Sequence, residues 1–221
     1  MTINTGSLPS AVSRVLPHDY RPSKPEWLVQ DLVAEGEVTA FGASEAKQRL
    51  AIGVGIARGL LGATAGPVLG HEPVRSVRSA LILATTLSLA KNYRLHTLGD
   101  RRVCVAQLTP WTPADPDYFE SLEHWDEFNA DIVLIDCVQD VPNGGPDASV
   151  LGSFERFGKT TVALFRGNDT RPGVGSTGMW AAAQQRFWFD PKTSQIHPVE
   201  AHVISAPWTV DLSLPSLAVR S

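Results

Sequence analysis

Residues 42–49 have the residue types to contact a nucleotide phosphate. In the loop pattern G-x-x-x-x-G-K-[ST], backbone N–H groups and a helix N-terminus hold phosphate, the lysine neutralises it and the hydroxyl binds magnesium. The chain has GASEAKQR here; if Lys47 is the phosphate lysine, the loop is one residue short, Ala46 replaces the second glycine and Gln48 replaces the hydroxyl residue. The candidate nucleotide-binding residues of this altered loop are Gly42, Ala43, Ser44, Ala46, Lys47 and Gln48.

Glu45 adds a carboxylate to the same loop. Like charges repel in a confined site unless a metal ion or a basic group lies between them, so Glu45 opposes the docking of a triphosphate. Two interpretations stay open: the loop is a remodelled phosphate cradle, or Glu45 and Lys47 simply occupy the first turn of a helix. The departures from the pattern favour the second interpretation.

A carboxylate at the end of an apolar run is the candidate magnesium ligand. Ile132 to Ile135 lead directly to Asp136, and an aspartate at such a strand end reaches a hydrated Mg²⁺ in many ATPases. Parallel strands also end in aspartate for capping reasons, so the pattern is weak by itself. Its position after a strand, a short loop and a helix strengthens the magnesium interpretation.

Polar residues after two other apolar runs are candidate sensors or phosphate contacts. Thr85 and Thr86 follow ALILA, and Arg166 and Arg171 come at and after the end of TTVALFR. A threonine hydroxyl cannot accept a proton at neutral pH without an activating partner, whereas an arginine can contact a phosphate or pair with a carboxylate. These residues therefore provide no general base, and hydrolysis by the usual route is not expected.

Metal ligands other than Asp136 are not indicated. The six histidines show no tight ligand spacing, and no cysteine lies close enough in sequence to complete a site, so we predict no zinc. Cys104 and Cys137 both lie in apolar, strand-like runs, which is typical of buried unpaired thiols.

Strand-like and helix-like segments alternate along the chain. We expect strands at 37–43, 79–85, 103–109, 131–138 and 160–167, and helices at 47–61, 87–99, 115–130 and 149–157. The alternation predicts an α/β fold with a mostly parallel sheet, helices on both faces, and a ligand site beyond the carboxyl ends of the strands. A C-terminal antiparallel extension is expected from strand-like runs at 186–190, 202–205 and 208–214.

The overall composition indicates one globular domain. The length of 221 residues suits a single α/β domain over residues 25–221, preceded by a flexible tail over 1–24. The apolar runs are too short to cross a membrane and the N-terminus does not resemble a secretory signal, so we expect a cytoplasmic protein without membrane contact. The formal net charge is -4, so contact with DNA would require a local basic patch.

Five segments together resemble the RecA-like P-loop ATPases of the RepA hexameric replicative helicase group, over about residues 25–190. These segments are EWLVQDLVAEGEVTAFGA, the expected helix from Lys47, GPVLGHEPVRSVRSALILA, ADIVLIDCV and GSTGMWAAAQQRFWF. The resemblance implies a RecA-like fold that binds ATP and Mg²⁺, with Lys47 and Asp136 matching the family's lysine and aspartate. It also implies that Thr85 and Thr86 stand where the family has a catalytic carboxylate, and that Arg166 stands where it often has the first of two histidines.

Two functions follow from this resemblance. The first is a pseudo-ATPase that binds or assembles with a DNA-processing protein, or with copies of itself, in DNA replication, recombination or repair. The second is an active ATP-dependent helicase or translocase with a remodelled phosphate loop. A small-molecule enzyme that reuses the crevice is a weaker third hypothesis, because no nucleophile and base are paired in the sequence.

Overall fold

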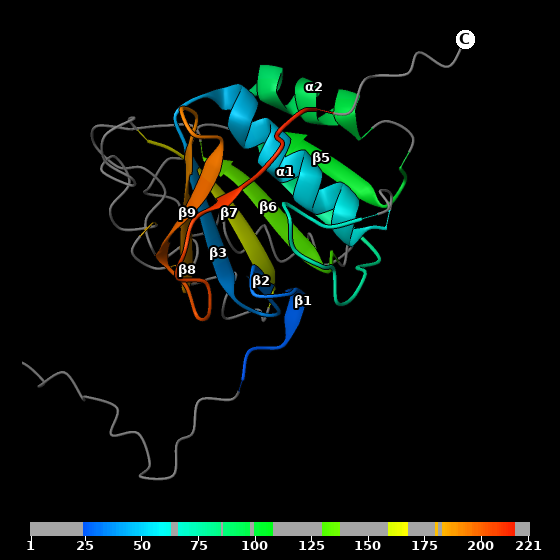
Figure 1. The fold of residues 1–221 in the computed structure, drawn as a ribbon. Helices are drawn as coiled ribbons and strands as arrows, with labels where there is room; N and C mark the ends of the chain where they lie inside the picture. The colour runs from blue at the N-terminus through cyan, green and yellow to red at the C-terminus, as the bar shows by residue number, and fades with distance from the viewer. Residues whose placement is uncertain are drawn as a thin grey trace, which may run out of the picture.

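The computed structural model describes residues 24–62, 66–84, 86–97, 100–107, 130–137, 159–167, 180 and 183–214. Strands and helices alternate from β3 to β5, and the described elements that follow are strands (Figure 1). They are β1 (Trp27–Val29), β2 (Val33–Ala34), β3 (Val38–Ala43), α1 (Ala46–Leu60), β4 (Ala80–Ala84), α2 (Leu87–His96), β5 (Val103–Gln107), β6 (Ile132–Cys137), β7 (Thr160–Arg166), β8 (Gln185–Asp190), β9 (Gln195–Glu200) and β10 (Trp208–Thr209).

Eight of these strands form one mixed sheet in the order β10-β9-β8-β3-β7-β6-β4-β5. The six strands from β8 to β5 are parallel, whereas β9 is antiparallel to β8 and β10 is antiparallel to β9. The expected α/β class, the mostly parallel sheet and the antiparallel C-terminal extension are therefore confirmed. The order also places β7 between β3 and β6, so the ends of these three strands meet at one edge.

The central strands are apolar on both faces because the sheet separates two hydrophobic clusters. On β3, Phe41 belongs to the cluster beneath the helices, whereas Val38 and Ala40 belong to the cluster on the opposite face. A strand with both faces buried needs a continuous apolar run. This is the physical reason why the sequence predicts the central strands so directly.

Both described helices cover the same face of the sheet, as Figure 1 shows. Helix α1 packs on β3, β6 and β7, and α2 packs on β4 and β5. Helix α1 ends as expected before Gly62, whose φ of 65° is the left-handed conformation that glycine adopts at low cost. The helices expected at 115–130 and 149–157 lie outside the described residues. No helix in the described ranges is long and apolar enough to cross a membrane.

One strand expectation is wrong. The segment 202–205 is not a strand, and β9 lies earlier, at Gln195–Glu200. The reason is the turn after β8: the Asp190 carboxylate accepts hydrogen bonds from the Lys192 N–H at 2.9 Å and from the Thr193 hydroxyl at 3.1 Å, and Ser194 has a φ of 54°. This tight turn pairs Asp190 with Gln195 and so fixes where the returning strand begins.

Candidate functional site

The candidate site lies where β3, β6 and β7 end and α1 begins. In a parallel sheet the carboxyl ends of the strands and the N-termini of the following helices meet at one edge, which is where ligands usually bind. Lys47, Asp136 and Arg166 lie at or near this edge, at the start of α1 and at the ends of β6 and β7. Asp136 is buried, whereas the side chains of Lys47 and Arg166 are exposed. Thr85 and Arg171 lie outside the described residues.

The connection from β3 to α1 contains two residues, Ser44 and Glu45. Strand β3 continues through Ala43, so Gly42 and Ala43 are strand residues and not part of a loop. A phosphate loop needs several consecutive backbone N–H groups turned toward one point. A two-residue connection cannot provide that cradle, so the loop is shorter than the sequence alone indicates.

Gly42 is required for packing against a tryptophan. A Cβ atom at Gly42 would lie 2.4 Å from Cε3 of Trp188, and one at Gly167 would lie 2.4 Å from Cζ3 of the same ring. Trp188 is buried on β8, directly opposite Gly42 in the register of the two strands. The glycine at the start of the supposed phosphate loop therefore makes room for an indole ring.

The N-terminus of α1 is capped by side chains of its own first turn. Glu45 and Gln48 form a capping box, in which the Gln48 side-chain oxygen accepts from the Glu45 N–H at 3.2 Å and the Glu45 carboxylate turns toward the Gln48 N–H. A carboxylate at this position satisfies free N–H groups and interacts favourably with the helix dipole. Glu45 thus places a carboxylate, and not a free row of N–H groups, at the N-terminus of α1.

Lys47 lies in the first turn of α1 with an exposed side chain. Together with Glu45 and Gln48 it borders a shallow hollow of about 250 Å³, whose other wall includes Phe189 and Leu212. The hollow is open to solvent. Lys47 is accessible to an anion here, but the geometry around it does not resemble a phosphate cradle.

Asp136 is fully buried and bound by two protein side chains. Its Oδ1 accepts a hydrogen bond from Nε of Arg49 at 3.2 Å, and its Oδ2 accepts one from the Tyr93 hydroxyl at 3.0 Å. Arg49 is 1% exposed and also donates from Nη1 to the carbonyl oxygen of Ala43 at 3.3 Å. Both carboxylate oxygens therefore already have a donor inside the protein.

The charges of this cluster are buried. Burial raises the pKa of Asp136, while Arg49 and the Tyr93 hydroxyl favour the carboxylate and oppose that rise. Burial, followed by the charge of Asp136, raises the pKa of Tyr93 well above its usual value, so the phenol keeps its proton and acts as a donor. The arrangement is a carboxylate neutralised by an internal guanidinium.

Arg49 and Tyr93 belong to the site although neither residue matches a motif in the sequence. A signal was present in α1, because Arg49, Gly53, Ile56 and Leu60 recur at helical spacing and all four are buried. An arginine in such a buried stripe requires a carboxylate partner. Asp136, at the end of a buried strand, was the available candidate.

Thr86 and Arg166, the described residues among the candidate sensors, have ordinary structural positions. Thr86 caps α2, where its hydroxyl oxygen accepts from the Leu89 N–H at 3.2 Å. Arg166 ends β7 opposite Ala43, with its side chain exposed. Among the described residues, no group of three or more histidine, cysteine, aspartate or glutamate side chains could hold a metal ion.

The fold therefore defines an α/β protein with a mostly parallel sheet, in which the carboxylate near the end of β6 is paired with an arginine of α1. Models of known protein families do not match this chain. Curated protein sequences give no match either.

Proposed function

We propose that this chain is a RecA-like pseudo-ATPase, which acts as a binding or assembly module in DNA replication, recombination or repair. The supporting observation is the buried cluster of Arg49, Tyr93 and Asp136, in which both oxygens of the expected magnesium ligand accept hydrogen bonds from protein side chains. In this proposal the guanidinium of Arg49 takes the place of the cation, and the Glu45 carboxylate takes the place of a phosphate at the N-terminus of α1.

The internal ion pair is costly to open. A magnesium ion could bind Asp136 only if Arg49 and Tyr93 moved away, and Arg49 would then be left as a buried charge without a carboxylate. The two-residue connection between β3 and α1 adds a second obstacle, because it lacks the backbone donors that hold a triphosphate. Both features support a role for the RecA-like surface without nucleotide chemistry.

The alternative is an active ATPase with a remodelled loop, and one observation favours it. Lys47 remains exposed at the N-terminus of α1, beside a hollow. Lysine is a common phosphate ligand, so a weak phosphate contact there would support this alternative.

Binding of a fluorescent ATP analogue tests the two functions against each other. We expect no saturable binding at millimolar nucleotide, with or without Mg²⁺. The matched variant is Lys47→Ala, because Lys47 is exposed and its removal does not disturb the core. Magnesium-dependent binding in the micromolar range that is lost in Lys47→Ala would overturn the pseudo-ATPase proposal and support the alternative.

A further inference from the structure

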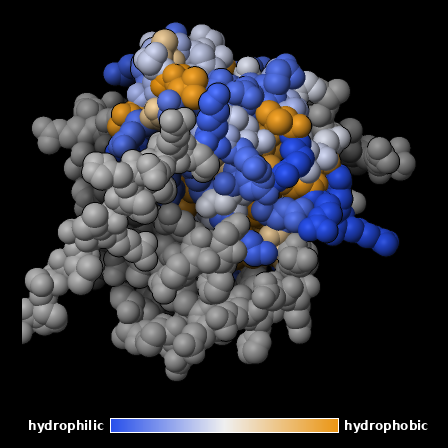
Figure 2. Space-filling model, turned by 90° about the horizontal axis from the view of Figure 1, so that it is seen from below, coloured by the Kyte–Doolittle hydropathy of each residue, from blue (hydrophilic) through white to orange (hydrophobic). Residues whose placement is uncertain are grey.

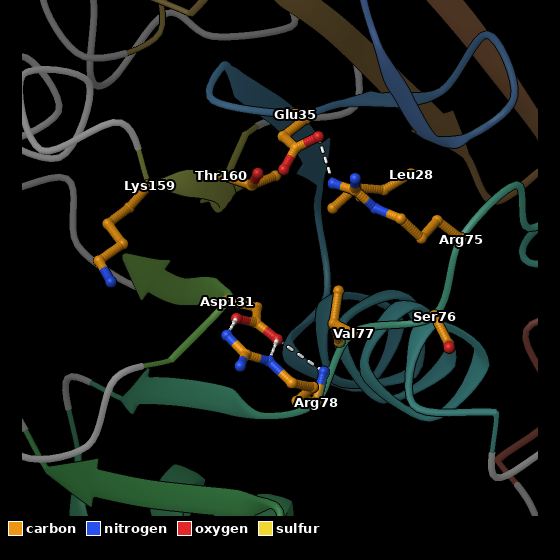
Figure 3. Close-up of a pocket in the computed structure, with 9 residues that line it drawn as sticks. All are labelled: Leu28, Glu35, Arg75, Ser76, Val77, Arg78, Asp131, Lys159 and Thr160. Atoms are coloured by element: carbon orange, nitrogen blue, oxygen red, sulfur yellow. Dashed lines mark hydrogen bonds and ion pairs between the residues drawn. The ribbon is translucent and has the colours of Figure 1, made fainter.

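The amino-terminal edge of the sheet, opposite the candidate site, has a hollow lined by charged side chains. Its volume is about 440 Å³, and it lies where β4, β6 and β7 begin. Figure 3 shows three cationic side chains around it, those of Arg75, Arg78 and Lys159, and two carboxylates, those of Glu35 and Asp131. The hollow therefore has one more cation than carboxylates.

A row of cations extends from the hollow along the amino-terminal ends of neighbouring strands. Lys159 precedes β7, Arg78 precedes β4 and Arg102 precedes β5, and these strands follow one another in the sheet as β7, β6, β4 and β5. Neighbouring strands lie about 4.8 Å apart, so the row is roughly 14 Å long. Arg101, next to Arg102, is exposed as well.

The arginines of the hollow and of the row are exposed and form ion pairs at the surface. The exposed fractions of the Arg75, Arg78 and Arg102 side chains are 54%, 81% and 46%. Arg78 donates to the Asp131 carboxylate through both Nε, at 3.3 Å, and Nη2, at 2.9 Å. Arg75 pairs with Glu35, and Arg102 donates to the Asp100 carboxylate through Nε, at 2.9 Å, and Nη2, at 2.7 Å. Ion pairs in contact with water are weak, so an incoming anion can take over the guanidinium groups.

Arginine-rich and hydrophilic surfaces suit phosphate better than an apolar protein partner. A guanidinium group binds a phosphate through two parallel hydrogen bonds, and four of the five cations are arginines. Figure 2, which looks at the molecule from below, shows the described residues on this side as mostly hydrophilic, with scattered hydrophobic spots. Protein interfaces instead depend on buried aromatic or apolar anchors.

We propose that Arg75, Arg78, Arg101, Arg102 and Lys159, here called the cationic edge, bind the phosphate backbone of DNA without reading its base sequence. This inference rests on the proposed role in DNA processing and names the surface involved. A row of roughly 14 Å faces about four phosphates of one strand, at 3.4 Å of helix axis for each phosphate. Because the whole chain has a formal net charge of -4, the interaction is local and sensitive to salt.

Fluorescence polarisation of labelled DNA, single-stranded and duplex, measures this interaction over a series of salt concentrations. Four neutralised phosphates predict a slope of log K against log salt of about -3. The test variant is Arg78→Ala/Lys159→Ala, which removes two cations and is expected to reduce the slope to about -1.5 and to weaken binding at least about tenfold at low salt.

The control variant, Lys91→Ala/Lys192→Ala, removes the same charge from exposed positions on α2 and on the turn after β8. It is expected to bind DNA like the unmodified protein. Thermal unfolding of both variants is measured to check that they are folded. Equal losses in both variants, or no loss in the test variant, would exclude the cationic edge as the binding surface.

The remaining outcomes separate this inference from the proposed function. If the unmodified protein binds no DNA at low salt, the inference is wrong. The pseudo-ATPase proposal is not affected by that result, because it is tested by nucleotide binding. If poly-glutamate binds at the cationic edge and DNA does not, the surface belongs to an acidic protein partner and the inference is again wrong.

Discussion

At the scale of single residues, the cluster of Arg49, Tyr93 and Asp136 determines what the candidate site can do. A carboxylate at the end of a parallel strand is commonly available for a metal, but here its two oxygens accept from a guanidinium and a phenol. The decisive residue is Arg49. It follows Gln48, the residue that stands where the phosphate-loop pattern has its hydroxyl. Its long side chain turns inward under the helix to reach β6.

Removing one partner of the buried pair is expected to destabilise the protein strongly. Asp136→Asn leaves the Arg49 guanidinium buried without a carboxylate and should lower the free energy of unfolding by about 3–5 kcal/mol. Urea unfolding measures this change. Asp131→Asn is the matched control because Asp131 pairs with the exposed Arg78, where loss of the charge costs about 0–1 kcal/mol. The asparagine oxygen can still accept the Arg78 backbone N–H, which Asp131 accepts at 2.7 Å.

Equal effects of the two aspartate substitutions would contradict a buried, structural ion pair. The double variant Arg49→Met/Asp136→Leu provides a further comparison. It removes both charges together, and we expect it to recover most of the stability lost in Asp136→Asn, since apolar replacement of a buried pair is often neutral.

At the scale of elements, α1 is fitted closely against its neighbours. Gly53 lies in the buried stripe of this helix, where an added Cβ atom would be 2.7 Å from the Tyr93 hydroxyl and 2.9 Å from Cδ1 of Leu164. Gly55, two residues further along, has its nearest such contact at 3.8 Å, from Cδ2 of Leu69. The small residue at position 53 lets α2 bring Tyr93 close to β6.

Alanine substitutions at these two glycines should have opposite effects. Gly53→Ala is expected to lower the free energy of unfolding by about 1–3 kcal/mol because the methyl group overpacks the core and displaces Tyr93. Gly55→Ala should raise it by about 0.5–1 kcal/mol, since alanine favours the helix where space is open. Thermal unfolding measures the stability of both variants. Stabilisation by Gly53→Ala would show that close packing at position 53 does not hold Tyr93 in place.

At the scale of the whole molecule, the antiparallel extension and the parallel sheet share one core. Ile196 on β9 and Val210 after β10 belong to the same buried cluster as the inward residues of α1. Trp208 joins distant segments, because its Nε1 donates to the carbonyl oxygen of Leu69 at 2.8 Å and its ring lies edge-on to Phe187 on β8. The protein is therefore expected to unfold as one unit.

Loss of Trp208 tests this cooperativity. Trp208→Ala removes the hydrogen bond and the ring contact and should lower the free energy of unfolding by about 2–4 kcal/mol. The unfolding midpoints seen by circular dichroism and by fluorescence of the remaining tryptophans should shift together. A change in fluorescence alone, with Thr209→Ala as the neutral neighbouring control, would show that the extension unfolds independently.

The two edges of the sheet differ in character. At the carboxyl edge, Glu45 and Arg49 close the candidate site from within, which supports the loss of nucleotide chemistry that we propose. At the amino edge the cations are exposed and weakly paired. The exposed cations make the amino-terminal edge, and not the carboxyl edge, the better surface for the DNA contact that we propose.

The sequence by itself determined the class of fold and the position of the candidate site. Continuous apolar runs such as the one ending at Asp136 identify buried parallel strands, and Gly62 marks the end of α1, because these signals depend on local backbone and burial preferences. The sequence also showed that the region around Ala46 and Gln48 departs from a working phosphate loop. These features need no knowledge of which distant residues meet.

Only the tertiary structure decided which groups contact Asp136 and Gly42. The pairing of Arg49 with Asp136 joins residues 87 positions apart, and the contact of Gly42 with Trp188 depends on the register between β3 and β8. The beginning of β9 was likewise set by the turn at Asp190 rather than by the apolar pattern of 202–205. These contacts depend on which strands are neighbours in the sheet. A buried charge can pair only with a group that the fold places next to it.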